Sequence, residues 1–383
     1  MKILLINYEF PPMGGGAGRA TYNLAEELVN LGHTVDVITS KIKGEADEQR
    51  IEGFTVFRVP SWRKGIHDCG LRGALTFVFF AAFRLRQLVK ENNYDVLHYF
   101  FGLPTGFLSL LPGKHQSIPY IVSLRGSDVP HYDIYNTRLQ WAHALLKPVT
   151  RRIWKRAKKV VAVTDSLKET AHETARDQEI IVVPNGVDTD LFKPKETFEE
   201  SDEVFKLICV TRLIERKGVE HLLEALAELK DKTIALSIFG TGSHENFLKN
   251  LCSNLLLNDQ VIFYGYCPWE ELPRYFAINH AFVLPSLAEA FGNAFAEAMA
   301  CGLPVIGGNS GGIRDLVQKG SGILVEPGNV EEIKQAIITL KNSKQLRGKM
   351  GRINRQRIQE EYSWPRVAER FVRIYQSGEG VSK

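Results

Sequence analysis

Cysteine is scarce in this sequence, and the few cysteines are scattered. The chain has five among its 383 residues, and no two of them stand at the spacing of a metal-ligating pair. Their odd number also argues against a framework of disulfides. We therefore expect a reducing, cytoplasmic compartment.

The sequence also lacks a strong excess of charge and any long apolar run. Its net charge of +4 is too small to argue for binding to nucleic acid. The longest apolar block, Ala74–Phe83, has about half the length that a helix needs to span a bilayer, so it is expected to be a helix buried in the protein. The opening run "KILLI" is too short for a signal peptide, and Glu9 and two prolines follow it.

What the sequence does contain is a regular alternation of short apolar runs and amphipathic segments. Residues 2–7, "KILLIN", predict a buried strand, residues 19–32 a helix that stops at Gly32, and residues 34–40, "TVDVITS", the next strand. This order is typical of a βαβ unit in a parallel sheet. Further strand-like runs follow at residues 95–100, 120–124, 159–164 and 179–184.

A polar, charged segment divides this pattern in two. Residues 193–204, "KPKETFEESDEV", are typical of a linker, and a second series of strand-like and helix-like runs follows it. The expected fold class is α/β, with two doubly wound, Rossmann-like domains and a cleft between them. The domain boundaries that this pattern suggests are 1–195 and 196–362.

The loop after the first predicted strand is rich in glycine but does not fit a dinucleotide-binding fingerprint. Its glycines never stand as G-x-G-x-x-G, and eight residues separate Ile6 from Gly15. Asp36 lies inside the next predicted strand and not at its end, where an acid that binds ribose would stand. Two interpretations stay open, a flexible loop or a backbone-lined anion site at the start of the following helix.

The densest cluster of candidate site residues lies in "PSLAEAFGNAFAEAMACG", residues 285–302. A helix is predicted to start near Phe291–Asn293, where its first backbone N–H groups would form an anion site. Glu289 precedes that start, and Glu297 lies inside the helix. Because carboxylates bind hydroxyls and not phosphate, an acid pair beside an anion site suggests sugar hydroxyls beside a diphosphate.

Two cations follow the first predicted strand of the second half, in "VTRLIERKG". Arg212 and Lys217 stand at the carboxyl edge of the predicted sheet, where they would neutralise a diphosphate without a metal ion. The alternative is that they are ordinary surface cations, as most Arg and Lys residues are. In two later loops, Gly240, Gly242 and Gly265 would let a base or ribose approach the backbone.

Together these motifs resemble glycosyltransferase family 4, the retaining nucleotide-sugar transferases of GT-B fold. The resemblance runs from residue 1 to about residue 375 and is most specific in the E-x7-E element, Glu289 to Glu297. It implies that Glu289 faces the donor sugar and that Glu297 binds the ribose. It also implies that a C-terminal segment, residues 363–383, crosses back to the first domain.

The same resemblance implies a set of site residues. The donor diphosphate is expected at Gly15, Gly16, Arg212, Lys217, Phe291, Gly292 and Asn293. The ribose and base are expected at Glu297, Gly240, Gly242 and Tyr266. The residues expected to act in catalysis are Glu289, Arg125, Asp128 and Lys217, with no metal site and no cofactor besides the nucleoside diphosphate sugar.

One position departs from the family pattern. Such enzymes commonly carry a histidine in an H-G-x-D loop close to the transferred sugar, whereas "SLRGSDVP" has Arg125 in that place and keeps Asp128. Arginine stays protonated at neutral pH, so it is no general base, but it donates hydrogen bonds to a sugar or an acceptor. His98 is a further candidate, although a lone histidine after a strand is more often structural.

The predicted activity is metal-independent transfer of a hexose from a UDP-sugar or GDP-sugar to an acceptor hydroxyl, in glycan, polysaccharide or glycolipid synthesis. Retention of configuration by front-face attack needs no carboxylate nucleophile, and the sequence assigns none. Three alternatives stay open. They are a catalytically silent sugar-nucleotide or glycan-binding subunit, an epimerase or phosphorylase of the same fold, and a nicotinamide dehydrogenase, which the glycine spacing disfavours.

Two segments suggest contact with a membrane. Residues 145–159 have seven basic residues and no acid, interleaved with Leu145, Leu146, Val149, Ile153 and Trp154. Such a helix lies on an anionic membrane or packs its apolar stripe on its own domain, and residues 76–87 leave the same two alternatives. The expected partners are a glycan or lipid-linked acceptor and the inner face of a membrane, with no nucleic acid.

Overall fold

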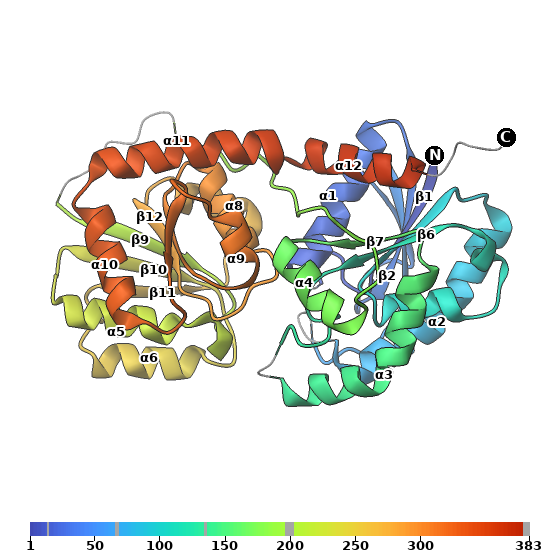
Figure 1. Cartoon of the computed structure of the whole chain (residues 1–383), viewed down its shortest axis with the longest axis horizontal. Coiled ribbons are helices and arrows are strands. Elements are labelled where there is room, and N and C mark those ends of the chain that lie inside the picture. The colour runs from blue at the N-terminus through green and yellow to red at the C-terminus, as the bar shows by residue number, and fades with distance from the viewer. Residues whose placement is uncertain (14, 66–68, 134–135, 196–202, 378–383) are drawn as a thin grey trace. The chain divides into compact units, whose positions relative to one another are not determined.

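The structure, a computed structural model, describes residues 1–383 except 14, 66–68, 134–135, 196–202 and 378–383 (Figure 1). The chain forms two compact units. Unit 1 comprises Met1–Gly186 with Trp364–Lys383, and unit 2 comprises Val187–Ser363. The division falls ahead of the polar segment predicted as the linker, which begins inside unit 2 and lies partly outside the described residues.

Unit 1 is built on one sheet of eight strands in the order β3-β4-β2-β1-β5-β6-β7-β8. The strands are β1 (Lys2–Ile6), β2 (Thr34–Lys41), β3 (Glu48–Ile51), β4 (Phe54–Pro60), β5 (Val96–Phe100), β6 (Tyr120–Leu124), β7 (Lys159–Ala162) and β8 (Ile180–Val182). Neighbouring strands pair in parallel, except that β3 pairs antiparallel with β4. β5 and β6 are buried along their whole length, as expected for central strands of a parallel sheet.

The helices of unit 1 include one from the far end of the chain. They are α1 (Gly16–Asn30), α2 (Gly70–Glu91), α3 (Thr137–Arg156), α4 (Asp165–Thr174) and α12 (Trp364–Gln376), with the 3-10 helices η1 (Thr105–Leu110) and η2 (Lys114–Ser117). α12 packs beside α1, and its residues Val367, Phe371 and Tyr375 join the apolar core of the unit (Figure 1). Across the described part of the chain, no helix has both the length and the apolar character of a membrane span.

Unit 2 is built on six parallel strands in the order β11-β10-β9-β12-β13-β14. The strands are β9 (Phe205–Val210), β10 (Ile234–Phe239), β11 (Val261–Gly265), β12 (Ala281–Leu284), β13 (Val305–Gly308) and β14 (Gly322–Val325). The helices are η3 (Glu215–Lys217), α5 (Val219–Leu229), α6 (Glu245–Asn254), η4 (Trp269–Glu271), α7 (Leu272–Phe276), α8 (Asn293–Ala300), α9 (Gly311–Leu316), α10 (Val330–Lys341) and α11 (Lys344–Glu361). The two doubly wound α/β units confirm the predicted fold class.

The strand order of each sheet reverses once, which marks where a ligand would bind. In unit 1, β1 lies between β2 and β5, and in unit 2, β9 lies between β10 and β12. Open α/β sheets bind ligands outside the carboxyl ends of their strands at such a switch point. The loops that follow β1 and β5 in unit 1, and β9 and β12 in unit 2, therefore border the position where a ligand is expected.

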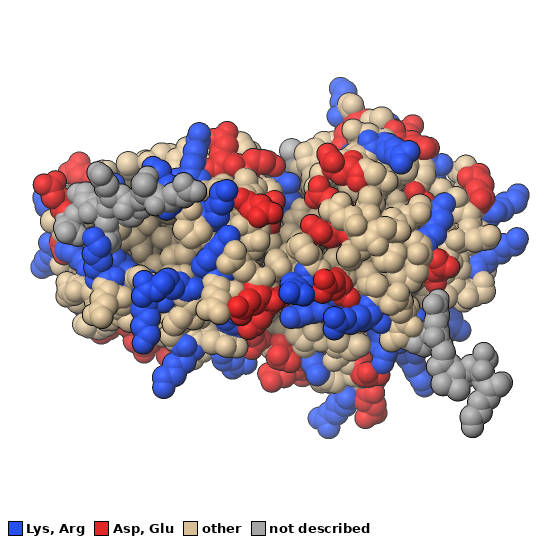
Figure 2. Space-filling view, turned by 90° about the horizontal axis from the view of Figure 1, so that it is seen from above, with Lys and Arg blue, Asp and Glu red and all other residues tan. Residues whose placement is uncertain are grey.

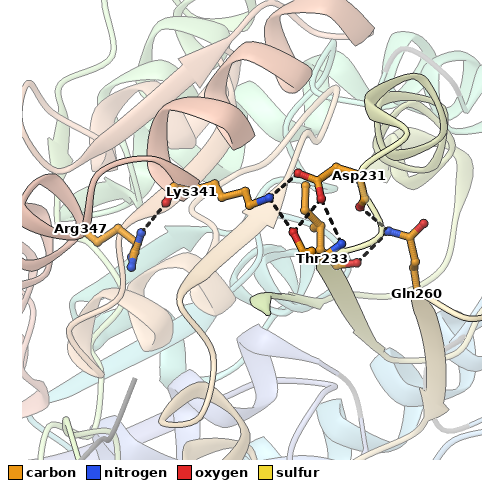
Figure 3. Close-up of polar contacts among 6 residues, drawn as sticks. Asp231, Thr233, Gln260, Lys341 and Arg347 are labelled. Carbon is orange, nitrogen blue, oxygen red and sulfur yellow. Dashed lines mark hydrogen bonds and ion pairs between the residues drawn. The ribbon is translucent and has the colours of Figure 1, made fainter. Parts of the chain in front are cut away.

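A polar network holds the opposite, amino edge of the unit 2 sheet (Figure 3). Lys341, at the end of α10, pairs with the carboxylate of Asp231 and donates to Thr233 Oγ1 at 2.7 Å, just before β10 begins. Gln260 Nε2 donates to the carbonyl of Asp231 at 2.8 Å, and Arg347 Nη1 donates to the carbonyl of Lys341 at 2.9 Å. The bond and charge of Lys341 and the bonds from Thr233 lower the pKa of Asp231 to about 2.

Candidate active site

A buried ion pair joins the two loops at the switch point of unit 2. Lys217 ends the short helix η3 after β9, and Glu289 lies in the loop after β12. Lys217 Nζ donates to Glu289 Oε1, and only 8% and 13% of the two side chains are exposed. The hydroxyl of Ser286 donates to the same carboxylate oxygen at 3.3 Å.

The electrostatics of this pair follow from its burial. Burial alone would raise the pKa of Glu289, but the charge and hydrogen bond of Lys217, helped by Arg216 and Ser286, hold that pKa below its ordinary value. Burial lowers the pKa of Lys217, and the nearby charges of Arg216 and Arg212 act in the same direction while Glu289 opposes them. The site therefore holds a buried carboxylate and a buried ammonium group, with the charges of the less buried Arg216 and Arg212 nearby.

Backbone packing forces these two loops together. Leu287 N donates to the carbonyl of Arg216 at 2.9 Å, which ties the loop after β12 to the loop after β9. Gly218 has φ +63°, and a Cβ atom there would lie 2.5 Å from the carbonyl oxygen of Pro285. Only glycine fits such a position, so Gly218 allows the two loops to pack closely and thereby fixes the position of the preceding Lys217.

The "SGG" element, residues 310–312, holds Glu289 from the other side. Gly312 N donates to the carbonyl of Glu289 at 2.8 Å, and Ser310 Oγ donates to the carbonyl of Ser286 at 3.0 Å. A Cβ atom on Gly311 would lie 2.2 Å from the carbonyl oxygen of Glu289. These residues position Glu289, a task that the sequence pattern alone did not reveal.

The helix predicted near Phe291–Asn293 begins there. α8 starts at Asn293, and Gly292 before it has φ +90°. The first helical bond runs from Phe295 N to the carbonyl of Gly292 at 3.0 Å. The amides before Phe295 therefore make no intrahelical bond, which is the arrangement of an anion site at the start of a helix. The start of α8 follows Glu289 by four residues in the same loop.

Glu297 is engaged by an aromatic residue that the sequence analysis missed. Trp269 Nε1, from η4, donates to Glu297 Oε1 at 2.8 Å. The indole ring also packs against Phe192 with a centroid distance of 5.0 Å. No local motif marks Trp269, because it lies 28 residues before Glu297 and only the fold brings the two together.

Of the remaining residues predicted in unit 2, Arg212 and Tyr266 are exposed, whereas Gly240 and Gly242 are packed against other backbone atoms. Arg212 is exposed, and among the described residues its guanidinium makes no ion pair. Gly240 and Gly242 are required by packing, because a Cβ atom on them would lie 1.7 Å from Thr211 O and 2.1 Å from Leu213 O. Tyr266 is exposed and follows β11, the edge strand of the sheet, so it lies further out than the other residues.

In unit 1, Gly15 and Gly16 stand at the start of α1, at the switch point of that sheet. Both are exposed, and Gly15 is the residue that precedes the first helical turn. A Cβ atom on Gly15 would meet no other atom within 4 Å, whereas one on Gly18 would lie 2.9 Å from the carbonyl oxygen of Met13. Packing explains Gly18 but not Gly15. Gly14 lies outside the described residues.

Arg125 follows β6, and its guanidinium lies over an aromatic ring. Its guanidinium lies 4.5 Å from the ring centroid of Phe100, and Nη1 donates to Asn185 Oδ1. Burial lowers the pKa of Arg125 to about 10, so it stays protonated at neutral pH. The side chain is thus a fixed donor and not a base, as its chemistry predicted.

Asp128 is occupied by backbone amides. Its Oδ1 accepts from Arg125 N at 2.8 Å and its Oδ2 from Gly102 N at 2.6 Å, which joins the loops after β5 and β6. Burial raises the pKa of Asp128 although these amides oppose the rise. This geometry makes Asp128 a positioning residue for Arg125. The expectation that it takes part directly in catalysis has no support in its contacts.

His98 is a core residue. It is fully buried, with Nδ1 2.8 Å from the hydroxyl of Tyr375 and Nε2 2.7 Å from Ser123 Oγ. Burial lowers its pKa well below the ordinary value for histidine, so the ring is neutral. The contact with Tyr375 anchors α12 to the sheet, which is the structural role that a lone histidine after a strand usually has.

The described residues contain no group of three or more His, Cys, Asp or Glu side chains arranged to hold a metal ion. The candidate site of unit 2 consists of Lys217, Arg212 and the backbone amides at the start of α8, together with the carboxylates of Glu289 and Glu297.

Comparison with known proteins accords with this geometry. Residues 14–191 match the family model described as Glycosyltransferase Family 4, and residues 190–357 match the model described as Glycosyl transferases group 1. An uncharacterized glycosyltransferase of Methanocaldococcus jannaschii is 28% identical over 98% of each chain. A GDP-mannose-dependent alpha-(1-6)-phosphatidylinositol monomannoside mannosyltransferase of Mycobacterium tuberculosis is 26% identical over 97% of each chain. Among solved structures, sucrose-phosphate synthase from Thermosynechococcus elongatus has a TM-score of 0.86 at 21% identity over 98% of each chain.

Proposed function

Because this chain belongs to glycosyltransferase family 4 and has the GT-B fold, we propose that it transfers a hexosyl group from a nucleoside diphosphate sugar to an acceptor hydroxyl with retention of configuration. The observation that supports this most directly is the buried pair of Lys217 and Glu289 beside the start of α8. It combines a site for an anion with a carboxylate that accepts hydrogen bonds from hydroxyls.

Unit 2 would bind the donor diphosphate. Negative charge grows on the diphosphate as the glycosidic bond breaks, and groups fixed in place stabilise that charge without reorganising. Lys217, Arg212 and the amides at Phe291, Gly292 and Asn293 are such groups. Their positive character replaces that of a metal ion, so the proposed reaction needs neither a metal nor a cofactor. Gly15 and Gly16 of unit 1 would add exposed amides for an anionic group.

Glu289 would orient the transferred sugar. Lys217 and Ser286 both bind its Oε1, and no other hydrogen bond to its carboxylate occurs among the described residues. Oε2 is then the atom that accepts from the sugar hydroxyls. The ion pair keeps the carboxylate ionised, which makes it a stronger acceptor than a neutral acid.

The remaining contacts would select the nucleoside and the acceptor. Glu297, held by Trp269, would accept from the ribose hydroxyls, and Gly240, Gly242 and Tyr266 would border the base. Arg125 would donate hydrogen bonds to the sugar or the acceptor, since its guanidinium makes one hydrogen bond, to Asn185, among the described residues.

The activities named for one relative and one structural neighbour suggest the substrate class. One relative uses GDP-mannose and modifies a phosphatidylinositol mannoside, and another is named as a sucrose-phosphate synthase. We propose a mannosyl or glucosyl donor and a glycan or lipid-linked acceptor, with the reaction taking place in the cytoplasm at the inner face of a membrane.

A donor panel tests this proposal. The purified chain would be heated with UDP-glucose, GDP-mannose, ADP-glucose and the free nucleotides, because a ligand that binds the folded state raises the melting temperature. The donor that does so would then be assayed for transfer, and the anomeric configuration of the product determined by NMR. Loss of transfer in EDTA, or an inverted product, would contradict the mechanism. Donor binding without turnover on any acceptor would indicate the silent binding subunit.

A further inference from the structure

Helix α2 leaves an apolar row exposed. Leu71, Leu75, Phe79 and Phe83 recur every four residues along α2 and therefore lie along one side of it. Their exposed fractions are 75%, 62%, 59% and 55%. Other residues of α2, namely Phe77, Ala81, Leu85 and Leu88, are buried against the unit. The expectation that the block Ala74–Phe83 is a buried helix therefore holds for Phe77, Ala81 and Ala82 and is wrong for Leu75, Phe79 and Phe83.

Helix α3 divides its apolar residues in the same way. Near its C-terminal end, Ile153 and Trp154 are fully buried in the unit. In its N-terminal half, Trp141 and Leu145 are 79% and 80% exposed and again stand four residues apart. The C-terminal half thus packs its apolar residues on its own unit, whereas the N-terminal half leaves Trp141 and Leu145 exposed.

The 3-10 helix η1 packs against both α2 and α3, and its Phe107 is 36% exposed. The term "α2–α3 surface" denotes the exposed residues Leu71, Leu75, Phe79, Phe83, Phe107, Trp141 and Leu145. Large exposed side chains gathered on adjoining elements are rare on proteins that bind nothing there, and they mark interaction sites.

The charge of α2 and α3 is strongly one-sided. α2 contains Arg72, Arg84, Arg86 and Lys90 with one acid, Glu91, and α3 contains Arg138, Lys147, Arg151, Arg152, Lys155 and Arg156 with no acid. The whole chain carries only +4, so the rest of it is net acidic. On the face drawn in Figure 2, by contrast, Lys and Arg lie among Asp and Glu.

We propose that the α2–α3 surface docks unit 1 onto an anionic lipid bilayer. The exposed Leu, Phe and Trp side chains would enter the boundary between headgroups and acyl chains, while Arg and Lys reach the lipid phosphates. A second copy of this chain fits poorly, because two such surfaces would bring like charges together. This proposal rests on the proposed function only in one respect: docking would bring the site close to a lipid-linked acceptor in the membrane.

Vesicle co-sedimentation tests the docking. The full chain is expected to sediment with vesicles of phosphatidylcholine and phosphatidylglycerol in equal parts, and at least about tenfold less with phosphatidylcholine alone, since each basic residue near the surface strengthens binding about fivefold. Added salt should weaken the binding. Changing Leu71, Leu75, Phe79 and Phe83 together to Gln, or Trp141 with Leu145, should reduce it at least about tenfold.

The controls separate docking from folding and from catalysis. Gln is a good helix former and the replaced side chains are exposed, so the melting temperature of these variants should stay near that of the wild type. Leu256→Gln with Ile262→Gln removes exposed apolar groups from unit 2 and should leave vesicle binding unchanged. Donor binding in the thermal assay should be unaffected by either helix change.

Three results would overturn the docking proposal: no sedimentation of the wild type with anionic vesicles, equal binding by the helix variants, or a wild-type dimer that the helix changes dissociate in the absence of vesicle binding. Normal vesicle binding by a chain that binds no donor would instead overturn the proposed function and leave the docking proposal intact.

Discussion

Changing Lys217 to Met removes one half of the buried ion pair and keeps the length of the side chain. Glu289 then stays in a place where 13% of its side chain is exposed, without the charge that offsets its burial. Removing one partner of a buried pair typically costs about 3–5 kcal/mol of stability, because the other charge is left uncompensated. Changing both residues, as Lys217→Met with Glu289→Gln, should therefore be less destabilising than Lys217→Met alone.

The contribution of Glu289 to the pH dependence of stability should change sign when Lys217 is replaced by Met. In the wild type the pKa of Glu289 is lowered, so its stabilising contribution is present above the pKa of an unfolded Glu and is lost as the pH falls. Without Lys217, burial would dominate and raise that pKa. The variant should then gain stability from Glu289 as the pH falls below neutral, because the buried carboxyl takes up a proton at a pH above the pKa of an unfolded Glu.

The effect on transfer should be large and should not follow stability. Removing one fixed positive group that stabilises developing charge costs about 10²- to 10³-fold in kcat. The double variant should recover stability but not activity, since it still lacks the cation and now also lacks the carboxylate. The assays are urea unfolding at several pH values and initial rates of transfer with the donor found by the panel.

A surface pair provides the matched control. Lys334 makes ion pairs with Glu228 and Glu331 on the outside of unit 2, so Lys334→Met should change neither transfer nor the sign of the pH dependence. Near-normal transfer by Lys217→Met, in a variant that folds, would refute the placement of the diphosphate. A Lys217→Met variant whose stability falls on acidification as steeply as that of the wild type would refute the electrostatic account of Glu289.

Three further outcomes follow from other contacts. Asp231→Asn should lower the free energy of unfolding by about 0.5–1 kcal/mol at neutral pH, a small value because a third of the Asp231 side chain is exposed. The difference from wild type should shrink as the pH falls from about 4 toward the lowered pKa of about 2. A difference independent of pH would contradict the pair with Lys341. Gly240→Ala should destabilise the fold by several kcal/mol, of order 3, because its Cβ would meet a carbonyl oxygen at 1.7 Å, and an unchanged melting temperature would show that the loop adapts. Trp269→Phe removes the donor to Glu297 and should raise KM for the donor about tenfold with little change in kcat, whereas equal kinetics would argue against Glu297 as the ribose ligand.

Much of the fold could be predicted from the sequence because the signals are local. The continuous apolar runs of β5 and β6 indicate strands buried on both faces, and the structure has them there. The start of α8 was predicted correctly near Phe291–Asn293, from the helix-like run that follows. Lys217 and Glu289 could be proposed as site residues because each follows a predicted strand, and parallel strands end at one edge.

Pairings between distant segments were beyond the sequence. Nothing near Glu297 indicates that Trp269 binds it, and nothing near Asp128 indicates that its oxygens are taken by the amides of Arg125 and Gly102. These contacts depend on strand order, which decides which loops become neighbours, and periodicity along the chain carries no information about that order. The boundary after Gly186 was not predicted either, since the expected one lay at residue 195, whereas the return of the C-terminal helix to unit 1 was expected from the family resemblance.

Exposure was the other property that only the tertiary structure decided. The composition of α2 and α3 established by itself that both helices are apolar and basic. Whether a given apolar side chain is covered depends on what packs against each helix face. Phe77 and Trp154 are covered by their own unit, and Phe79 and Trp141 are not, although Phe77 and Phe79 lie in one helix and Trp141 and Trp154 in another. Sequence thus determined the chemical character of these helices, and packing determined which part of it faces outward.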